Sequence, residues 1–102
     1  MKQVLALMLL CCSAYAQDAA VVHINADFNV SNDWYGLKSL DNAKVYGGSI
    51  DKQPALVEKY NITKVPTLIL FNDGVEVMRW EAGLDMKLHV TTKEVQHKID
   101  AL

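Results

Sequence analysis

The chain has 102 residues, a formal net charge of −2 and a hydrophobic fraction of 51%. This length suffices for one small domain with one core and excludes two independent domains. Basic and acidic residues are interspersed along the chain rather than grouped in blocks, which excludes a basic surface for nucleic acid or anionic membrane. No nucleic-acid partner is therefore expected.

The N-terminal end of the chain has the pattern of a secretory signal peptide. Lys2 supplies a positive charge, an apolar run follows from Val4 to Cys12, and Ala14-Tyr15-Ala16 is the small-x-small pattern that signal peptidase recognises. The apolar run is much shorter than the roughly 20 residues that a membrane-spanning helix needs. We therefore expect an exported protein, whether secreted, periplasmic or in the lumen of the secretory pathway, with no membrane association in its mature form.

Cleavage after Ala16 divides the chain into a signal peptide, residues 1–16, and a single domain, residues 17–102. Both cysteines, Cys11 and Cys12, lie in the signal peptide. The exported domain would therefore contain no cysteine and no disulfide. Because Lys2 is also removed, the net charge of the domain would be −3.

The first half of the domain predicts two strands with a short helix between them. Residues 21–26 are rich in β-branched side chains and predict a strand. A helix is expected from Asp33 to about Leu40, because Asn32 is a good N-cap and Asp33 suits the positive end of the helix dipole. Residues 44–50 predict a second strand, weakened by its pair of glycines.

A second helix is expected from Pro54 to Tyr60. Proline is tolerated in a first helical turn, and Asp51 or Gln53 is expected to cap the helix. Asn61 suits the left-handed conformation in which many helices end.

The last third of the chain predicts a β-hairpin and a terminal helix. Residues 67–71 form an apolar run that is typical of a strand covered on both faces, and Asn72-Asp73-Gly74 predicts a tight turn into a strand over residues 75–80. Thr91 and Glu94 have capping-box spacing ahead of a helical pattern. The resulting order, β-α-β-α-β-β-α, predicts an α/β fold with a four-stranded mixed sheet flanked by helices and an antiparallel fourth strand at one edge.

The segment Val65-Pro66-Thr67, with the apolar strand and hairpin turn that follow it, closely resembles the cis-proline segment of thioredoxins. The resemblance extends from Val21 to about Gly83 and implies a minimal thioredoxin-like fold with a cis bond before Pro66. In thioredoxins a Trp-Cys-Gly-Pro-Cys-Lys motif follows the first core strand. Here the sequence at that place is Phe28-Asn29-Val30-Ser31-Asn32-Asp33.

Asn29 and Asn32 therefore occupy the positions of the two redox cysteines. An amide cannot form a thiolate, so the resemblance implies a domain without catalytic residues. The buried acid of thioredoxins falls on His23, for which we expect a core or semi-exposed strand position rather than an acid–base role, and the basic residue after the second cysteine falls on Asp33. The spacing of His23, His89 and His97 does not fit a metal site, and no metal or cofactor is expected.

The resemblance also implies a binding function. In the family the cis bond leaves the N–H and C=O of the preceding residue, here Val65, free to pair with an extended peptide. We therefore expect a non-catalytic domain that binds an extended polypeptide or a partner protein between the loop that replaces the cysteine motif and the proline corner. The candidate groove residues are Phe28, Asn29, Val30, Ser31, Asn32, Val65 and Pro66.

Several alternatives stay open at the level of sequence. Val65-Pro66 is alternatively a corner that the fold requires, and Trp34 and Tyr35 either extend the groove or belong to the core. If Cys11 and Cys12 were retained, a thiol–disulfide oxidoreductase would be the alternative function. A third alternative is a structural subunit of an exported assembly, and the sequence leaves the oligomeric state unknown.

Two sequons mark candidate glycosylation sites. They are Asn29-Val30-Ser31 and Asn61-Ile62-Thr63. They have meaning only if the exporting cell is eukaryotic. A glycan on Asn29 would cover the expected groove.

Overall fold

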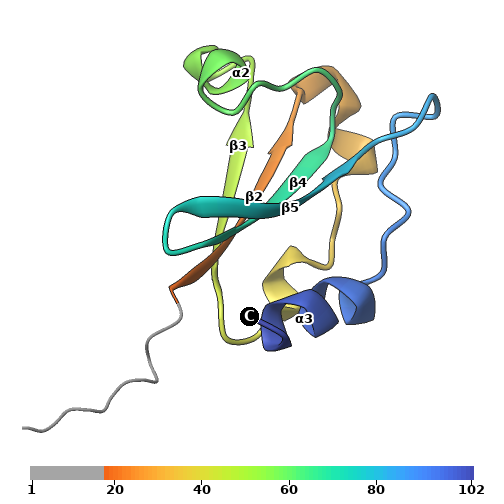
Figure 1. The fold of residues 1–102 in the computed structure, drawn as a ribbon. Coiled ribbons are helices and arrows are strands. Elements are labelled where there is room, and N and C mark those ends of the chain that lie inside the picture. The colour runs from red at the N-terminus through yellow and green to blue at the C-terminus, as the bar shows by residue number, and fades with distance from the viewer. Residues whose placement is uncertain (1–17) are drawn as a thin grey trace, which may run out of the picture.

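The computed structural model describes residues 18–102, and the predicted signal peptide with Cys11 and Cys12 lies outside the described residues. Four strands form one sheet in the order β3-β2-β4-β5 (Figure 1). These strands are β2 (Ala19–Asn25), β3 (Lys44–Ser49), β4 (Thr67–Asn72) and β5 (Val75–Glu81). The helices are α2 (Ala55–Lys59), α3 (Thr92–Asp100) and the 3-10 helices η2 (Asp27–Asn32) and η3 (Leu37–Ser39). The predicted α/β fold with a mixed four-stranded sheet is confirmed.

The sheet is mixed because β2 lies parallel to β3 and antiparallel to β4. Strands β4 and β5 form the predicted antiparallel hairpin, with β5 at one edge. At the turn, Asp73 and Gly74 have φ angles of 51° and 82°. Two successive residues with positive φ are typical of the tight turn that matches strand twist, which explains why an Asp-Gly pair stands there.

Alternate side chains of the central strands β2 and β4 enter two different cores, one on each face of the sheet. The core on the α3 side contains Ala19, Val21, Leu40, Leu68, Leu70, Val95 and Ile99. The core on the α2 side contains Val22, Ile24, Ala26, Ile62, Val65 and Ile69. In Figure 1, α3 lies beside η3, whereas α2 lies at the arrowhead end of β3.

The prediction of a helix from Asp33 to Leu40 is wrong. The chain instead forms the 3-10 helices η2 and η3, which end at Asn32 and Ser39. Asp33 accepts a hydrogen bond from Asn25 Nδ2 at 2.7 Å, and Asn32 donates to Asn29 Oδ1 at 2.7 Å rather than capping a helix. These side-chain contacts outweigh the N-cap signal, since Asn32 ends η2 and Asp33 has an extended ψ of 141° that a helix would not allow.

Both α-helices lie close to their predicted positions. Pro54 takes the N-cap position of α2 without a side-chain cap, so Asp51 and Gln53 do not cap it. Asp51 instead accepts a hydrogen bond from the N–H of Asp27 at 2.6 Å. Asn61 has a φ angle of 53° at the end of α2, and Thr91 caps α3 by accepting from the Glu94 N–H at 3.1 Å, both as predicted. No helix in residues 18–102 is long and apolar enough to cross a membrane.

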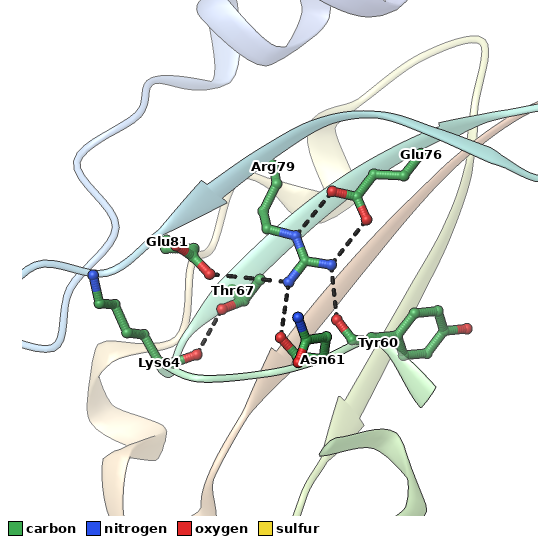
Figure 2. A network of polar contacts seen from close by, with 7 residues as sticks. All are labelled: Tyr60, Asn61, Lys64, Thr67, Glu76, Arg79 and Glu81. Carbon is green, nitrogen blue, oxygen red and sulfur yellow. Dashed lines mark hydrogen bonds and ion pairs between the residues drawn. The ribbon is translucent and has the colours of Figure 1, made fainter. Parts of the chain in front are cut away.

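Arg79 on β5 holds the segment that leads from α2 to Pro66 (Figure 2). Its guanidinium donates to the carbonyl oxygens of Tyr60 at 2.7 Å and Asn61 at 3.2 Å. The Glu76 carboxylate accepts from the same guanidinium at 2.9 and 2.8 Å, which lowers the pKa of Glu76 and raises that of Arg79. Carbonyl groups at a helix end have no hydrogen-bond donor within the helix. Here Arg79 is the donor.

We expect Arg79→Met to lower the free energy of unfolding by about 1 kcal/mol, because two carbonyl groups lose a charged donor. Loss of the ion pair with Glu76 should lower the free energy of unfolding only slightly further, since the Glu76 side chain is 41% exposed. Urea unfolding followed by tryptophan fluorescence measures this change. Arg79→Lys should recover only part of the loss, because lysine lacks the planar fork of donors. Equal stability of Arg79→Met and the parent chain would contradict this role.

Candidate functional site

The carboxyl end of β2, the η2 loop, the proline corner and the segment after β5 meet around Asn29. This residue is only 5% exposed. Its Nδ2 lies 3.1 Å from Asn25 Oδ1, 3.0 Å from the carbonyl oxygen of Met86 and 3.5 Å from that of Val65. An amide NH2 has two hydrogens, so the longest contact, to Val65, is the weakest of the three. One side chain thus joins three segments that are far apart in sequence: the end of β2 with the η2 loop, the proline corner, and the segment after β5.

The neighbours of Asn29 complete its hydrogen bonding. Asn32 Nδ2 donates to Asn29 Oδ1 at 2.7 Å. Asn25 Nδ2 donates to the carbonyl oxygen of Asn29 at 2.9 Å and to Asp33 Oδ1 at 2.7 Å. Asn29 and Asn32 are therefore joined by a hydrogen bond, and polar contacts with Asn25 and Asp33 fix the loop that they occupy.

The Val65-Pro66 bond is cis, as the resemblance implies. Both residues are buried, and the carbonyl of Pro66 accepts from the Ala82 N–H at 3.1 Å. Thr67 Oγ1 donates to the Lys64 carbonyl at 2.6 Å (Figure 2). Within residues 18–102 the N–H of Val65 has no hydrogen-bond acceptor. The carbonyl of Val65 accepts the long hydrogen bond from Asn29 Nδ2. Of the two backbone groups of Val65, the N–H is thus left without a partner in the described part of the chain.

Apolar side chains around Asn29 face solvent. Phe28 is 74% exposed, Val30 is 58% exposed and Leu84 is fully exposed. Ser31 is also exposed, and Asn32 is half-buried. A pocket of about 420 Å³ lies beside the proline corner and is lined by Thr63, Lys64, Val65, Gly83, Leu84 and Met86. Sequence reasoning missed Leu84 and Met86, because no periodic pattern in that segment connects them to Pro66.

The two aromatic residues after η2 have different positions. Trp34 packs against the core on the α3 side, and its Nε1 donates to the Val90 carbonyl at 2.9 Å. Tyr35 is 79% exposed. Trp34 therefore belongs to the core and does not extend the groove.

His23 is buried below the loop, so of the core and semi-exposed positions that the sequence allows, the structure has the core one. Its Nε2 accepts a hydrogen bond from the Trp34 N–H at 3.1 Å. This nitrogen therefore carries no proton, and the imidazole ring is neutral. Burial lowers the pKa of His23, and the nearby Asp33 carboxylate opposes part of this effect. The neutral ring thus fixes the backbone after η2 and has no nucleophile beside it in residues 18–102.

The two sequon asparagines are not equivalent. The Asn29 side chain is buried and fully hydrogen-bonded, so a glycan on its Nδ2 is incompatible with the observed network. Asn61 is exposed at the end of α2. The structure therefore leaves Asn61 as the sequon that a glycan can occupy without disturbing the fold.

We expect the free energy of unfolding to fall as the pH is lowered from about 7.5 to 5.5, because the unfolded chain binds a proton at His23, near pH 6.5, more readily than the folded chain does. His23→Gln should remove most of this slope, since the Gln oxygen can still accept from Trp34. His97→Gln, at an exposed position, is the matched control and should keep the slope. Urea unfolding at each pH gives the comparison, and an unchanged slope in His23→Gln would refute the assignment.

No family model matches the chain. Over 31 residues the chain is 55% identical to a thioredoxin from Chlamydia caviae, and this match spans 30% of the chain and 30% of the length of that relative. The likeness in sequence is thus local.

Solved structures match over most of the chain. A mutant thioredoxin from Halobacterium salinarum NRC-1 aligns with a TM-score of 0.64 at 23% identity, over 82% of this chain and 74% of that chain. Thioredoxin-2 of a malaria parasite, described as a component of protein secretion machinery, aligns with a TM-score of 0.64 at 15% identity, over 84% of each chain. Mitochondrial thioredoxin 3 from Saccharomyces cerevisiae aligns with a TM-score of 0.56 at 14% identity, over 85% of this chain and 81% of that chain. Residues 18–102 therefore have a thioredoxin-like fold.

Proposed function

We propose that this thioredoxin-like domain is exported, is not an enzyme, and binds an extended polypeptide segment beside the proline corner. We call this surface the peptide groove and define it by Phe28, Val30, Val65, Leu84 and Met86. The observation that supports the proposal is the position of Asn29. Its amide holds the loop in place while the apolar side chains on either side of it stay exposed.

The chemistry of the loop supports binding rather than catalysis. Thiol–disulfide exchange requires a thiolate, and residues 18–102 contain no cysteine. Asn29 and Asn32 are neutral amides whose polar atoms bond to each other and to the surrounding chain. The oxidoreductase alternative depends entirely on Cys11 and Cys12, which lie outside the described residues.

The geometry suits strand addition. The unpaired N–H of Val65 can donate to a carbonyl of an extended peptide, as an exposed sheet edge does. The adjacent pocket between Val65 and Met86 can take an apolar side chain of that peptide. Because the Val65 carbonyl already contacts Asn29, the peptide would gain fewer backbone hydrogen bonds than at a free edge, and its apolar contacts would supply much of the affinity.

We expect the domain to bind reduced, carboxymethylated α-lactalbumin, a permanently unfolded chain that has no free thiol. Phe28→Asp and Leu84→Asp should each weaken this binding by roughly tenfold, because each places a charge among the apolar contacts. Isothermal titration or fluorescence anisotropy measures the dissociation constants.

Val75→Asp is the matched control for this experiment. Val75 is an apolar residue of β5 that is 64% exposed and lies outside the peptide groove. Its variant should bind the unfolded chain with the parent affinity. If all three variants bound equally well, or if the parent chain did not bind, the proposed groove would be wrong.

A further inference from the structure

A second surface lies on the face of the sheet that α2 covers. Pairing in the sheet places Val22 opposite Tyr46 and Ala20 opposite Phe71, so these four side chains point to the same face. Helix α2 has only five residues. It covers the carboxyl end of β3, where a Cβ on Gly48 would lie 2.7 Å from Leu56 Cδ1. Among residues 18–102, no helix covers this face near the amino-terminal ends of β2 and β3.

The uncovered area forms a groove of about 570 Å³, which we call the sheet-face groove. Its apolar walls include Val22, Leu56, Tyr46, Tyr60 and Phe71. This volume lies within the range of roughly 300–1,000 Å³ that is usual for small-molecule sites, and such sites combine aromatic walls with a few polar groups. None of the residues of the peptide groove lines it.

The charged side chains on the rim of the groove favour an anionic ligand. Lys44 and Lys59 both line the groove, and neither forms an ion pair within the described part of the chain. The Lys59 ammonium lies 5.2 Å from the centroid of the Tyr60 ring, at the edge of the aromatic wall. Asp18 is the one acidic side chain among the lining residues that the structure describes. The groove thus has an excess of positive charge, although the whole chain is acidic.

We propose that the sheet-face groove binds a small amphipathic anion, a molecule with an apolar tail and one carboxylate. The tail lies against Val22, Tyr46 and Phe71, and the carboxylate pairs with a lysine of the rim. Lys44 and Lys59 are both exposed, so either ammonium is free to turn toward the carboxylate and form a charge-assisted hydrogen bond with it. This site does not depend on the proposed peptide binding.

The probe is decanoate, titrated into the purified chain after its processing state has been verified by intact mass. We expect saturable shifts of the amide resonances of Gly47 and Gly48 in ¹H–¹⁵N spectra, with those of Gly83 and Leu84 unchanged. Combined Lys44→Glu and Lys59→Glu substitution should weaken decanoate binding at least roughly tenfold. Lys93→Glu, an exposed lysine of α3, is the matched control and should leave binding unchanged.

Two further tests separate this ligand from other occupants. Ala20→Phe, whose added ring fills the groove, should abolish the shifts while the far-ultraviolet circular dichroism stays that of the parent. Decylammonium and decan-1-ol should bind at least roughly tenfold more weakly than decanoate, because they lack the negative charge. Equal binding of the three probes, full binding by the double lysine variant, or a self-association that buries Gly47 in the absence of probe would each overturn the proposal. If Ala20→Phe did not fold, the lysine variants alone would decide.

Discussion

The site depends on the buried amide of Asn29. Its contacts to Asn25, Val65 and Met86 hold the end of β2, the proline corner and the segment after β5 against one loop. A buried polar group without partners is costly, so removing this amide would leave several groups unpaired at once. By the family resemblance, Asn29 falls at the position of a redox cysteine in thioredoxins. At this position the chain thus has a group that fixes geometry and cannot carry out thiol chemistry.

Two other polar groups hold the segments that Asn29 joins. The neutral ring of His23 accepts from the backbone after η2, and Arg79 binds the carbonyl groups at the end of α2, ahead of Pro66. Each group is on a strand, and each bonds to a backbone atom of a neighbouring loop. In residues 18–102, side chains of the sheet therefore hold the loops and fix the position of the proline corner.

The sequence predicted the elements whose signals are local. The four strands, the Asp73-Gly74 turn and the Thr91 cap follow from alternation, turn chemistry and capping, and Pro66 and the asparagine positions follow from the family resemblance. The segment after Asn32 could not be predicted in the same way, because Asp33 bonds to Asn25 and because Thr92 of α3 and Trp34 leave no room for a side chain at Gly36. Leu84 and Met86 belong to the site through packing alone. The sheet-face groove exists because α2 is short, and its charge comes from lysines on two separate elements.

The most direct test of this account compares the stabilities of Asn29→Ala and Asn32→Ala by urea unfolding. Asn29 is buried with several partners, whereas Asn32 is half-buried and donates only to Asn29 among the residues described. We predict that Asn29→Ala lowers the free energy of unfolding by about 2–4 kcal/mol and that Asn32→Ala lowers it by about 1 kcal/mol. A loss for Asn29→Ala no larger than that for Asn32→Ala would contradict the central role of the Asn29 amide.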